Sequence, residues 1–423
     1  MLKIETKKFK KALQVAALIA RDKLPLQVLR GVLFDGDNIT ATNSEQSITF
    51  CLDWEGDRAD LPKSLVETNA LLSVLPKDTF TRVSVNGKMQ IGKVALPLLD
   101  AGEFPVVPEV QYHEDQRIGF LPAKELQKML EQTLRFVADP DEVRVMLRTI
   151  SIRTKKADNE GYDGLEFAGT DGRRLSITSV MAEEIAENFE GYIPSESARI
   201  LLGILKKTEN SDIQIYYRPG ENNERGTFFF TGKLWNYSCK ARNGHFPNYN
   251  SALMESHKKG DLENSFRVNR AKLLAAVQEA IAVTPKKERC SNPAYALYLA
   301  PSSDGLLILF SGALTDGYLE REFETVIPCE ILRGENYFTV INPDYLLDAL
   351  ETSDETDVMF SAHDPTSMIG IEDGTTREAY VMPVHVEFPC IKSCGNRVKM
   401  PGARCGECDG KEDEASGETS DSV

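Results

Sequence analysis

The sequence has few of the residues and none of the motifs that usually identify an enzyme or a membrane protein. Its 423 residues include only five histidines and two tryptophans. The histidines stand apart, and no P-loop, Gly-x-Gly-x-x-Gly turn or His-Glu-x-x-His motif is present. No apolar run approaches the roughly 20 residues that a membrane helix needs. The start at Met1 lacks the apolar stretch of a secretory signal. These absences favour a cytoplasmic protein without catalytic activity. An enzyme is the main alternative, and assays for nuclease, phosphatase and polymerase activity would test it.

Positive charge is also scarce, since 49 basic residues stand against 65 acidic ones and the net charge is −16. A protein that bound nucleic acid over its whole surface would not be so acidic. Residues 7–23 nevertheless carry six basic residues against one acidic residue, and residues 267–287 carry five against one. Two interpretations stay open: ordinary solvated helix faces, or one shared basic surface. Such a surface would hold phosphates without reading bases.

The eight cysteines divide into two groups. Cys51, Cys239, Cys290 and Cys329 stand singly in apparent strands and loops, and we expect them to be buried, reduced thiols. The other four crowd into the last part of the chain, and their spacing is typical of a structural zinc site. The alternative is a flexible, reducible tail. These possible metal ligands are Cys390, Cys394, Cys405 and Cys408.

A chain of this length is expected to form two to four domains, and a threefold internal repeat is visible in it. Each repeat opens with a strand and an amphipathic helix, continues with strands, and then contains a second helix and more strands. This order predicts an α+β fold of three similar domains, each with two helices packed on antiparallel sheets. The predicted helices are 7–21, 64–75, 123–137, 195–205, 270–283 and 343–350, and the predicted strands include 28–34 and 144–153. The predicted domains are 1–117, 118–260 and 261–388, followed by a Cys-rich and acidic tail, 389–423.

Three short stretches carry a family resemblance. Thr170-Asp171-Gly172-Arg173-Arg174 lies between two alternating apolar runs, which predicts a hairpin turn because glycine tolerates positive φ. Phe246-Pro247-Asn248-Tyr249 and Tyr380-Val381-Met382-Pro383-Val384 end the second and third repeats. Together these stretches resemble the bacterial sliding clamps, the β subunits of DNA polymerase III, over about residues 1–388. The resemblance implies a head-to-tail homodimeric ring of six domains, with helices lining a hole that encloses duplex DNA. It implies a processivity factor that tethers the polymerase, catalyses nothing and requires no cofactor.

The resemblance also implies functional residues. Clamps of this family bind the polymerase, the clamp loader and repair proteins through short peptides, in a pocket between the second and third domains. The pocket positions here are Leu147, Thr170, Gly172, Arg173, Arg174, Leu175, Pro247, Tyr345, Thr366, Met368, Val381, Met382, Pro383 and Val384. Ordinary core packing is the alternative for Leu147, Leu175 and Val381. Arg21 falls at a DNA-contact position of the family. Helix placement adds Lys10, Lys11, Arg199, Lys206 and Lys272 as predicted DNA contacts.

Three departures from the family pattern bear on partner choice. Asn250-Ser251 and His385 stand where arginines are expected, which softens the positive rim of the pocket. The tail continues past the usual end of the family, so we expect it to cover the pocket or to recruit another partner. Deletion of residues 389–423 would then change peptide affinity. A second interpretation is a clamp-like interaction protein, of phage or mobile-element type, that binds replication proteins without encircling DNA. Its oligomeric state would distinguish it from a ring.

Overall fold

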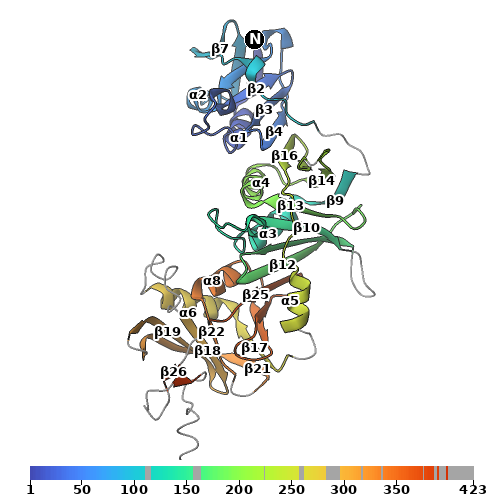
Figure 1. Cartoon of the computed structure of the whole chain (residues 1–423). Helices are drawn as coiled ribbons and strands as arrows, with labels where there is room; N and C mark the ends of the chain where they lie inside the picture. The colour runs from blue at the N-terminus through green and yellow to red at the C-terminus, as the bar shows by residue number, and fades with distance from the viewer. Residues whose placement is uncertain are drawn as a thin grey trace, which may run out of the picture. The chain divides into compact units, whose positions relative to one another are not determined.

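The computed structural model describes residues 1–109, 116–155, 163–222, 224–256, 262–282, 296–315, 318–334, 337–374, 376–384, 388–389 and 397–398. The chain divides into two compact units (Figure 1). Unit 1 comprises Met1–Gly172 and Ser176–Pro247, and unit 2 comprises Arg173–Leu175 and Asn248–Val423. No helix within the described ranges has both the length and the apolar content needed to cross a membrane.

The first repeat of unit 1 contains two antiparallel sheets and two helices. One sheet has the order β1-β6-β7-β8, and the other set of strands has the order β5-β2-β3-β4. The helices are α1 (Thr6–Ala16) and α2 (Thr68–Val74). The strands are β1 (Leu2–Glu5), β2 (Gly31–Asp35), β3 (Asn38–Thr42), β4 (Gln46–Cys51), β5 (Ser64–Glu67), β6 (Phe80–Val85), β7 (Lys88–Ile91) and β8 (Val94–Pro97).

The second repeat of unit 1 has the same plan, with strand orders β16-β15-β14-β9 and β13-β10-β11-β12. Strands β4 and β16 pair antiparallel, with Ile48 opposite Tyr237, so one sheet runs through both repeats of this unit. One apolar core follows that sheet, because helix and strand side chains of both repeats belong to a single buried cluster. The elements are α3 (Ala123–Leu134), α4 (Ser195–Lys207), β9 (Arg117–Pro122), β10 (Thr149–Lys155), β11 (Gly164–Thr170), β12 (Arg174–Met181), β13 (Glu190–Pro194), β14 (Asp212–Arg218), β15 (Thr227–Thr231) and β16 (Trp235–Lys240).

Unit 2 holds the third repeat. Its strand orders are β25-β24-β23-β17-β21 and β20-β19-β18-β22, all antiparallel, and α6 packs against α8. The short strands β26 (Phe388–Pro389) and β27 (Arg397–Val398) also pair. The remaining elements are α5 (Tyr249–Ser256), α6 (Arg270–Ala282), α8 (Pro343–Glu351), β17 (Asn264–Asn269), β18 (Ala296–Ser302), β19 (Gly305–Thr315), β20 (Tyr318–Ile327), β21 (Cys329–Arg333), β22 (Thr339–Ile341), β23 (Asp357–Ala362), β24 (Ile369–Glu372) and β25 (Arg377–Val381).

The predicted α+β class and the six predicted helices are confirmed, with corrections at their ends. Helix α1 ends at Ala16 rather than Arg21, and residues 64–67 form β5 rather than the start of α2. Helix α5 was not predicted, because its apolar residues follow no clear helical period.

The predictions that strands begin at residues 28 and 144 were wrong in the same way in both repeats. The 3-10 turns Gln27–Arg30 and Val145–Arg148 precede β2 and β10. The last arginine of each turn reaches back to a carbonyl: Arg30 donates to Leu24 O at 2.7 Å and Arg148 donates to Pro140 O at 2.6 Å. A short apolar run fits a strand and a buried turn equally well, so periodicity could not separate them.

Candidate functional site

The turn between β11 and β12 confirms the predicted hairpin. Gly172 adopts φ +87°, a left-handed conformation that side chains disfavour. The Gly172 amide donates to Thr170 Oγ1 at 3.0 Å, which closes the turn. A Cβ at Gly172 would lie 3.4 Å from Arg144 Nη1 and 3.6 Å from Leu147 Cδ1, so backbone conformation rather than lack of space requires glycine here.

The Arg174 side chain is held in one position in unit 2 by Asp348 and Tyr345, and we call it the Arg174 wall. Its Nη1 lies 2.5 Å from Asp348 Oδ2, and its guanidinium carbon lies 4.5 Å from the centre of the Tyr345 ring. The Arg174 side chain is only 11% exposed. An ion pair on one side and an aromatic face on the other leave this arginine little rotational freedom. Asp348, which holds Arg174, lies on α8.

The end of the third repeat lies beside this wall. The Met382 amide donates to Arg173 O at 2.8 Å, and the Val384 amide donates to Val340 O at 2.7 Å. Val384 packs on the small apolar cluster around Phe338 and Val340. These backbone bonds hold the Met-Pro-Val segment against β22 and the turn residue Arg173.

The side chains of this part of unit 2 differ in exposure. Met382 is 44% exposed, while Met368 is 9% exposed and Val381 is fully buried. The burial of Val381 is what core packing requires, so its role in binding stays a prediction, whereas the Met382 side chain is exposed. Thr366 is exposed but engaged, because its amide and its hydroxyl both donate to Asp364 Oδ1. The Thr366 hydrogen bonds, foremost the one from its side chain, lower the pKa of Asp364.

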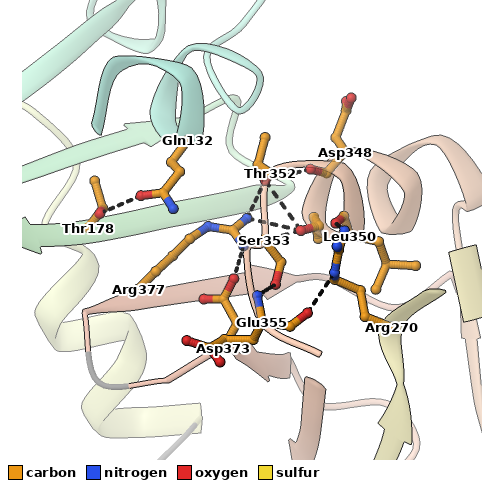
Figure 2. Close-up of polar contacts among 11 residues, drawn as sticks. Gln132, Thr178, Arg270, Asp348, Leu350, Thr352, Ser353, Glu355, Asp373 and Arg377 are labelled. Atoms are coloured by element: carbon orange, nitrogen blue, oxygen red, sulfur yellow. Dashed lines mark hydrogen bonds and ion pairs between the residues drawn. The ribbon is translucent and has the colours of Figure 1, made fainter. Parts of the chain in front are cut away.

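Helix α8 is held from its C-terminal end by two arginines that the sequence did not single out (Figure 2). Arg377, 1% exposed, donates to the Ala349 carbonyl at 3.2 Å, to the Thr352 hydroxyl, and to Asp373 Oδ2 at 2.8 Å. Arg270 donates to the Leu350 carbonyl at 3.1 Å. Cations at a helix C-terminus satisfy unpaired carbonyls and oppose the negative end of the dipole. Burial lowers the pKa of the Arg377 guanidinium, and the Asp373 carboxylate counteracts that shift.

Three further predicted pocket residues lie in unit 1. Leu147, in the 3-10 turn Val145–Arg148, is 4% exposed, and Thr170 is 7% exposed. Pro247 is exposed at the end of the unit. Beside Leu147, the Arg144 side chain donates to Glu142 Oε1 at 2.9 Å. That hydrogen bond is the main reason why the pKa of Glu142 falls to about 2. The burial of Leu147 and Leu175 is what core packing requires, so their role in binding stays a prediction.

The predicted DNA-contact residues are mostly exposed. In unit 1, α4 packs against both α1 and α3, so Lys10, Lys11 and Arg199 come from neighbouring helices. Lys10 and Lys11 have no ion-pair partner among the described residues. Lys272 is exposed on α6 of unit 2.

The other two predicted contacts are already in ion pairs. Lys206 Nζ lies 2.7 Å from Glu131 Oε1, and Arg21 Nη1 lies 3.9 Å from Glu196 Oε1. Arg21 also donates to Leu18 O. Binding a phosphate at either position would have to compete with a carboxylate.

The cysteine predictions have mixed outcomes. Cys239 is buried, and burial raises its pKa to about 12. The prediction that Cys51 is buried was wrong, because it ends β4 on the outward side, next to the inward Phe50. Cys329 is half-buried. Cys290, His385 and the possible zinc ligands Cys390, Cys394, Cys405 and Cys408 lie outside the described residues. Within the described ranges, no group of three or more potential ligands surrounds a metal position.

Comparison with known proteins identifies the fold. No protein-family model matches the chain. The Beta sliding clamp of Synechococcus elongatus is 28% identical over 336 residues, which cover 77% of this chain and 81% of that protein. The Beta sliding clamp of Rickettsia bellii is 27% identical over 406 residues, which cover 91% of this chain and 100% of that protein.

Solved structures agree with these relatives. The DNA polymerase sliding clamp from Bacillus subtilis matches with a TM-score of 0.74 at 19% identity, over 90% of this chain and 98% of that chain. The DNA polymerase III subunit beta from Pseudomonas aeruginosa matches with a TM-score of 0.73 at 21% identity, over 90% and 99%. The chain therefore has the sliding-clamp fold. The resemblance to the β subunits of bacterial DNA polymerase III is confirmed, with curated relatives that bear the name Beta sliding clamp.

Proposed function

We propose that this protein is a sliding clamp that closes as a homodimer around duplex DNA and tethers the replicative DNA polymerase, without catalysing a reaction and without a required cofactor. The main support is the clamp fold over 90% of the chain, together with a relative named Beta sliding clamp that aligns over its whole length. A tether raises the effective concentration of the polymerase at the primer end, so it needs little direct affinity for DNA.

Two open sheet edges support ring closure. Within unit 1, β4 ends one four-stranded set and β16 ends the next, and the two pair antiparallel. Strand β8 is the last strand of the order β1-β6-β7-β8, the position that β16 has in β9-β14-β15-β16. Strand β20 is the last strand of the order β22-β18-β19-β20, the position that β4 has in β5-β2-β3-β4. Among the described residues, β8 and β20 each pair with one strand only. Because an open edge is a template for another strand, β8 of one copy can pair with β20 of a second copy. The reciprocal contact then closes a head-to-tail dimer.

A substitution on β8 tests this closure. Val94 is 42% exposed on β8, and Val94→Asp would place a charge in the paired edge. We expect the dimer, of mass near twice 47.1 kDa, to dissociate at least about tenfold more readily, since burying an unpaired charge is costly. The matched control is Val106→Asp, because Val106 is 98% exposed and lies outside the strands. A native protein that is monomeric at micromolar concentration would instead support the clamp-like interaction protein.

Topological binding is the direct test of function. The protein is loaded onto nicked circular DNA with a clamp loader, and the DNA is then linearised. A ring is retained on circles and lost from linear ends, whereas a protein bound by contacts alone dissociates equally from both. If the protein stays bound equally long on circular and on linearised DNA, the tethering proposal is refuted.

The basic helices supply the proposed DNA contacts, which are Arg21, Lys10, Lys11, Arg199, Lys206 and Lys272. Lys10→Glu together with Lys11→Glu should shorten the lifetime of clamps on circular DNA and flatten its salt dependence, because phosphate contacts release counterions. The control pair is Lys63→Glu with Lys77→Glu, two exposed lysines outside the helices and strands. An equal loss in both pairs would mean that net charge, and not these positions, matters.

We also propose that partner peptides bind through the residues implied by the family resemblance. The fixed Arg174 wall and the exposed Met382 of unit 2 support this assignment. Arg174→Ala should weaken binding of a polymerase-derived peptide about tenfold, since both its ion pair and its stacked guanidinium are lost. Arg218→Ala serves as the control, because Arg218 stacks on Phe229 in unit 1 and is not a predicted contact.

A further inference from the structure

Unit 1 contains an open pocket that none of the proposed peptide-binding residues lines. It lies among the start of α1, the end of β4, the residues after α4 and the turn between β15 and β16. Its floor is apolar, because Phe50, Leu52 and Trp235 are each less than 9% exposed. Leu234, 40% exposed, and the exposed Cys51 also line it.

The size of the pocket limits what can enter it. Its volume is about 80 Å³, and a dry cavity of about 150 Å³ is enough for a benzene molecule. The pocket therefore has room for one aliphatic side chain of three or four carbons.

The polar residues that line the pocket favour an anionic ligand. Lys8, Lys11 and Lys233 line it against two acids, Asp53 and Glu209. Lys11 and Lys233 have no ion-pair partner among the described residues, and Lys8 Nζ forms an ion pair with Glu5 Oε2 at 3.6 Å. Helix α1 carries four lysines and no acid, in a chain whose net charge is −16. The mouth of the pocket is therefore a basic patch on an acidic protein, and it attracts negatively charged segments.

We propose that this pocket is a second docking site for partner proteins, which takes one aliphatic side chain from an acidic linear segment. The side chain enters the apolar floor, and carboxylates on either side of it pair with the ammonium groups of Lys8, Lys11 and Lys233. One small anchor with solvent-exposed ion pairs gives weak affinity, with a Kd on the order of 0.1–1 mM. The site therefore acts as an auxiliary contact for a partner that is also held elsewhere.

Cys51 provides a built-in reporter for the test. The full-length protein is treated with iodoacetamide, and the alkylation rate of each cysteine is followed by peptide mass mapping. The probe is the acetylated and amidated peptide Glu-Asp-Leu-Glu-Asp. We expect it to slow alkylation of Cys51 and to leave Cys329, in unit 2, unaffected. Replacing its leucine by serine should weaken protection about tenfold, because the apolar anchor is lost. Replacing its acids by lysines should abolish protection.

Protein variants complete the test. Lys233→Glu should weaken protection at least about threefold, because one attractive pair becomes repulsive. Lys77→Glu, an exposed lysine after α2 that does not line the pocket, makes the same change in net charge and should have no effect. Equal protection by the leucine and serine peptides would overturn the proposal. So would equal effects of the two lysine variants. Lys11 lines this pocket and is also a proposed DNA contact, so DNA and the peptide would compete for it. The protection assay is therefore run without DNA and with the Lys233 variant, and its outcome does not depend on the result of the DNA-retention assay.

Discussion

The buried arginine of unit 2 allows a demanding prediction. Arg377 and Asp373 form an ion pair at 2.8 Å, and their side chains are 1% and 3% exposed. Arg377→Met keeps much of the side-chain volume but leaves the Asp373 carboxylate without its cation. Breaking a buried pair in this way costs about 3–5 kcal/mol. We expect the free energy of unfolding of unit 2 to fall by this amount. The carbonyl of Ala349 also loses its donor, which adds to the loss.

The control comes from the same unit. Arg267 and Glu330 form an ion pair at 3.3 Å on the surface, with side chains 50% and 62% exposed. Arg267→Met should cost less than about 1 kcal/mol, since exposed pairs contribute little. The double variant Arg377→Met with Asp373→Leu should recover most of the stability, because apolar replacement of both partners of a buried pair is often nearly neutral.

The assay has to separate the two units. Denaturant unfolding followed by circular dichroism can show more than one transition in a chain of this kind. Hydrogen exchange of the α8 amides reports on unit 2 directly. If Arg377→Met costs no more than Arg267→Met, the buried pair is not what fixes α8. A double variant as unstable as the single one would mean that the lost carbonyl contacts, rather than the stranded carboxylate, dominate.

Three further outcomes follow from single positions. Gly172→Ala should destabilise the protein by about 1–2 kcal/mol, because alanine disfavours a left-handed φ. Gly172→Asn should destabilise it less. Equal melting temperatures for the native protein and the alanine variant would contradict this. Glu142 has its pKa lowered from 4.5 to about 2, so its ion pair with Arg144 stabilises the fold fully above pH 4.5 and is lost as the pH falls towards 2. Glu142→Gln should therefore remove part of the stability change measured across that window, and an unchanged acid titration would contradict it. At pH 8, iodoacetamide should modify the exposed Cys51 in the native protein and reach the buried Cys239 only in denaturant; equal rates would contradict the burial that raises the pKa of Cys239.

Much of the fold could be predicted because the signals are local. Helices α3, α4, α6 and α8 begin at the predicted residues, since each combines a helical apolar period with a preceding strand. The turn at Gly172 could be predicted because only glycine tolerates its φ readily. The outward position of Cys51 had a signal that we did not use: Ile48 and Phe50 alternate inward along β4, so the next residue points outward.

The contacts that organise the candidate site could not be predicted, because they join residues far apart in the chain. Arg377 lies in a short strand, four residues after Asp373, and the sequence shows only an arginine between Thr376 and Glu378. Its other partners, Ala349 and Thr352, are 28 and 25 residues away. Arg174 finds Asp348 across 174 residues. No period or motif of the sequence encodes such pairs.

The acidic character of α8 now has a physical reason. The basic residues of α1 and α6 left open the interpretation that the helices share one positive surface, whereas α8 carries Asp344, Asp348 and Glu351. Asp348 holds Arg174, and a lysine in its place would repel that guanidinium at a separation of a few ångströms. The C-terminal end of α8 is also bound by Arg270 and Arg377, whose charges suit an acidic helix. The charge of this helix is therefore set by the residues it holds in place within unit 2, and a basic α8 would disrupt the Arg174 wall whatever it gained towards DNA.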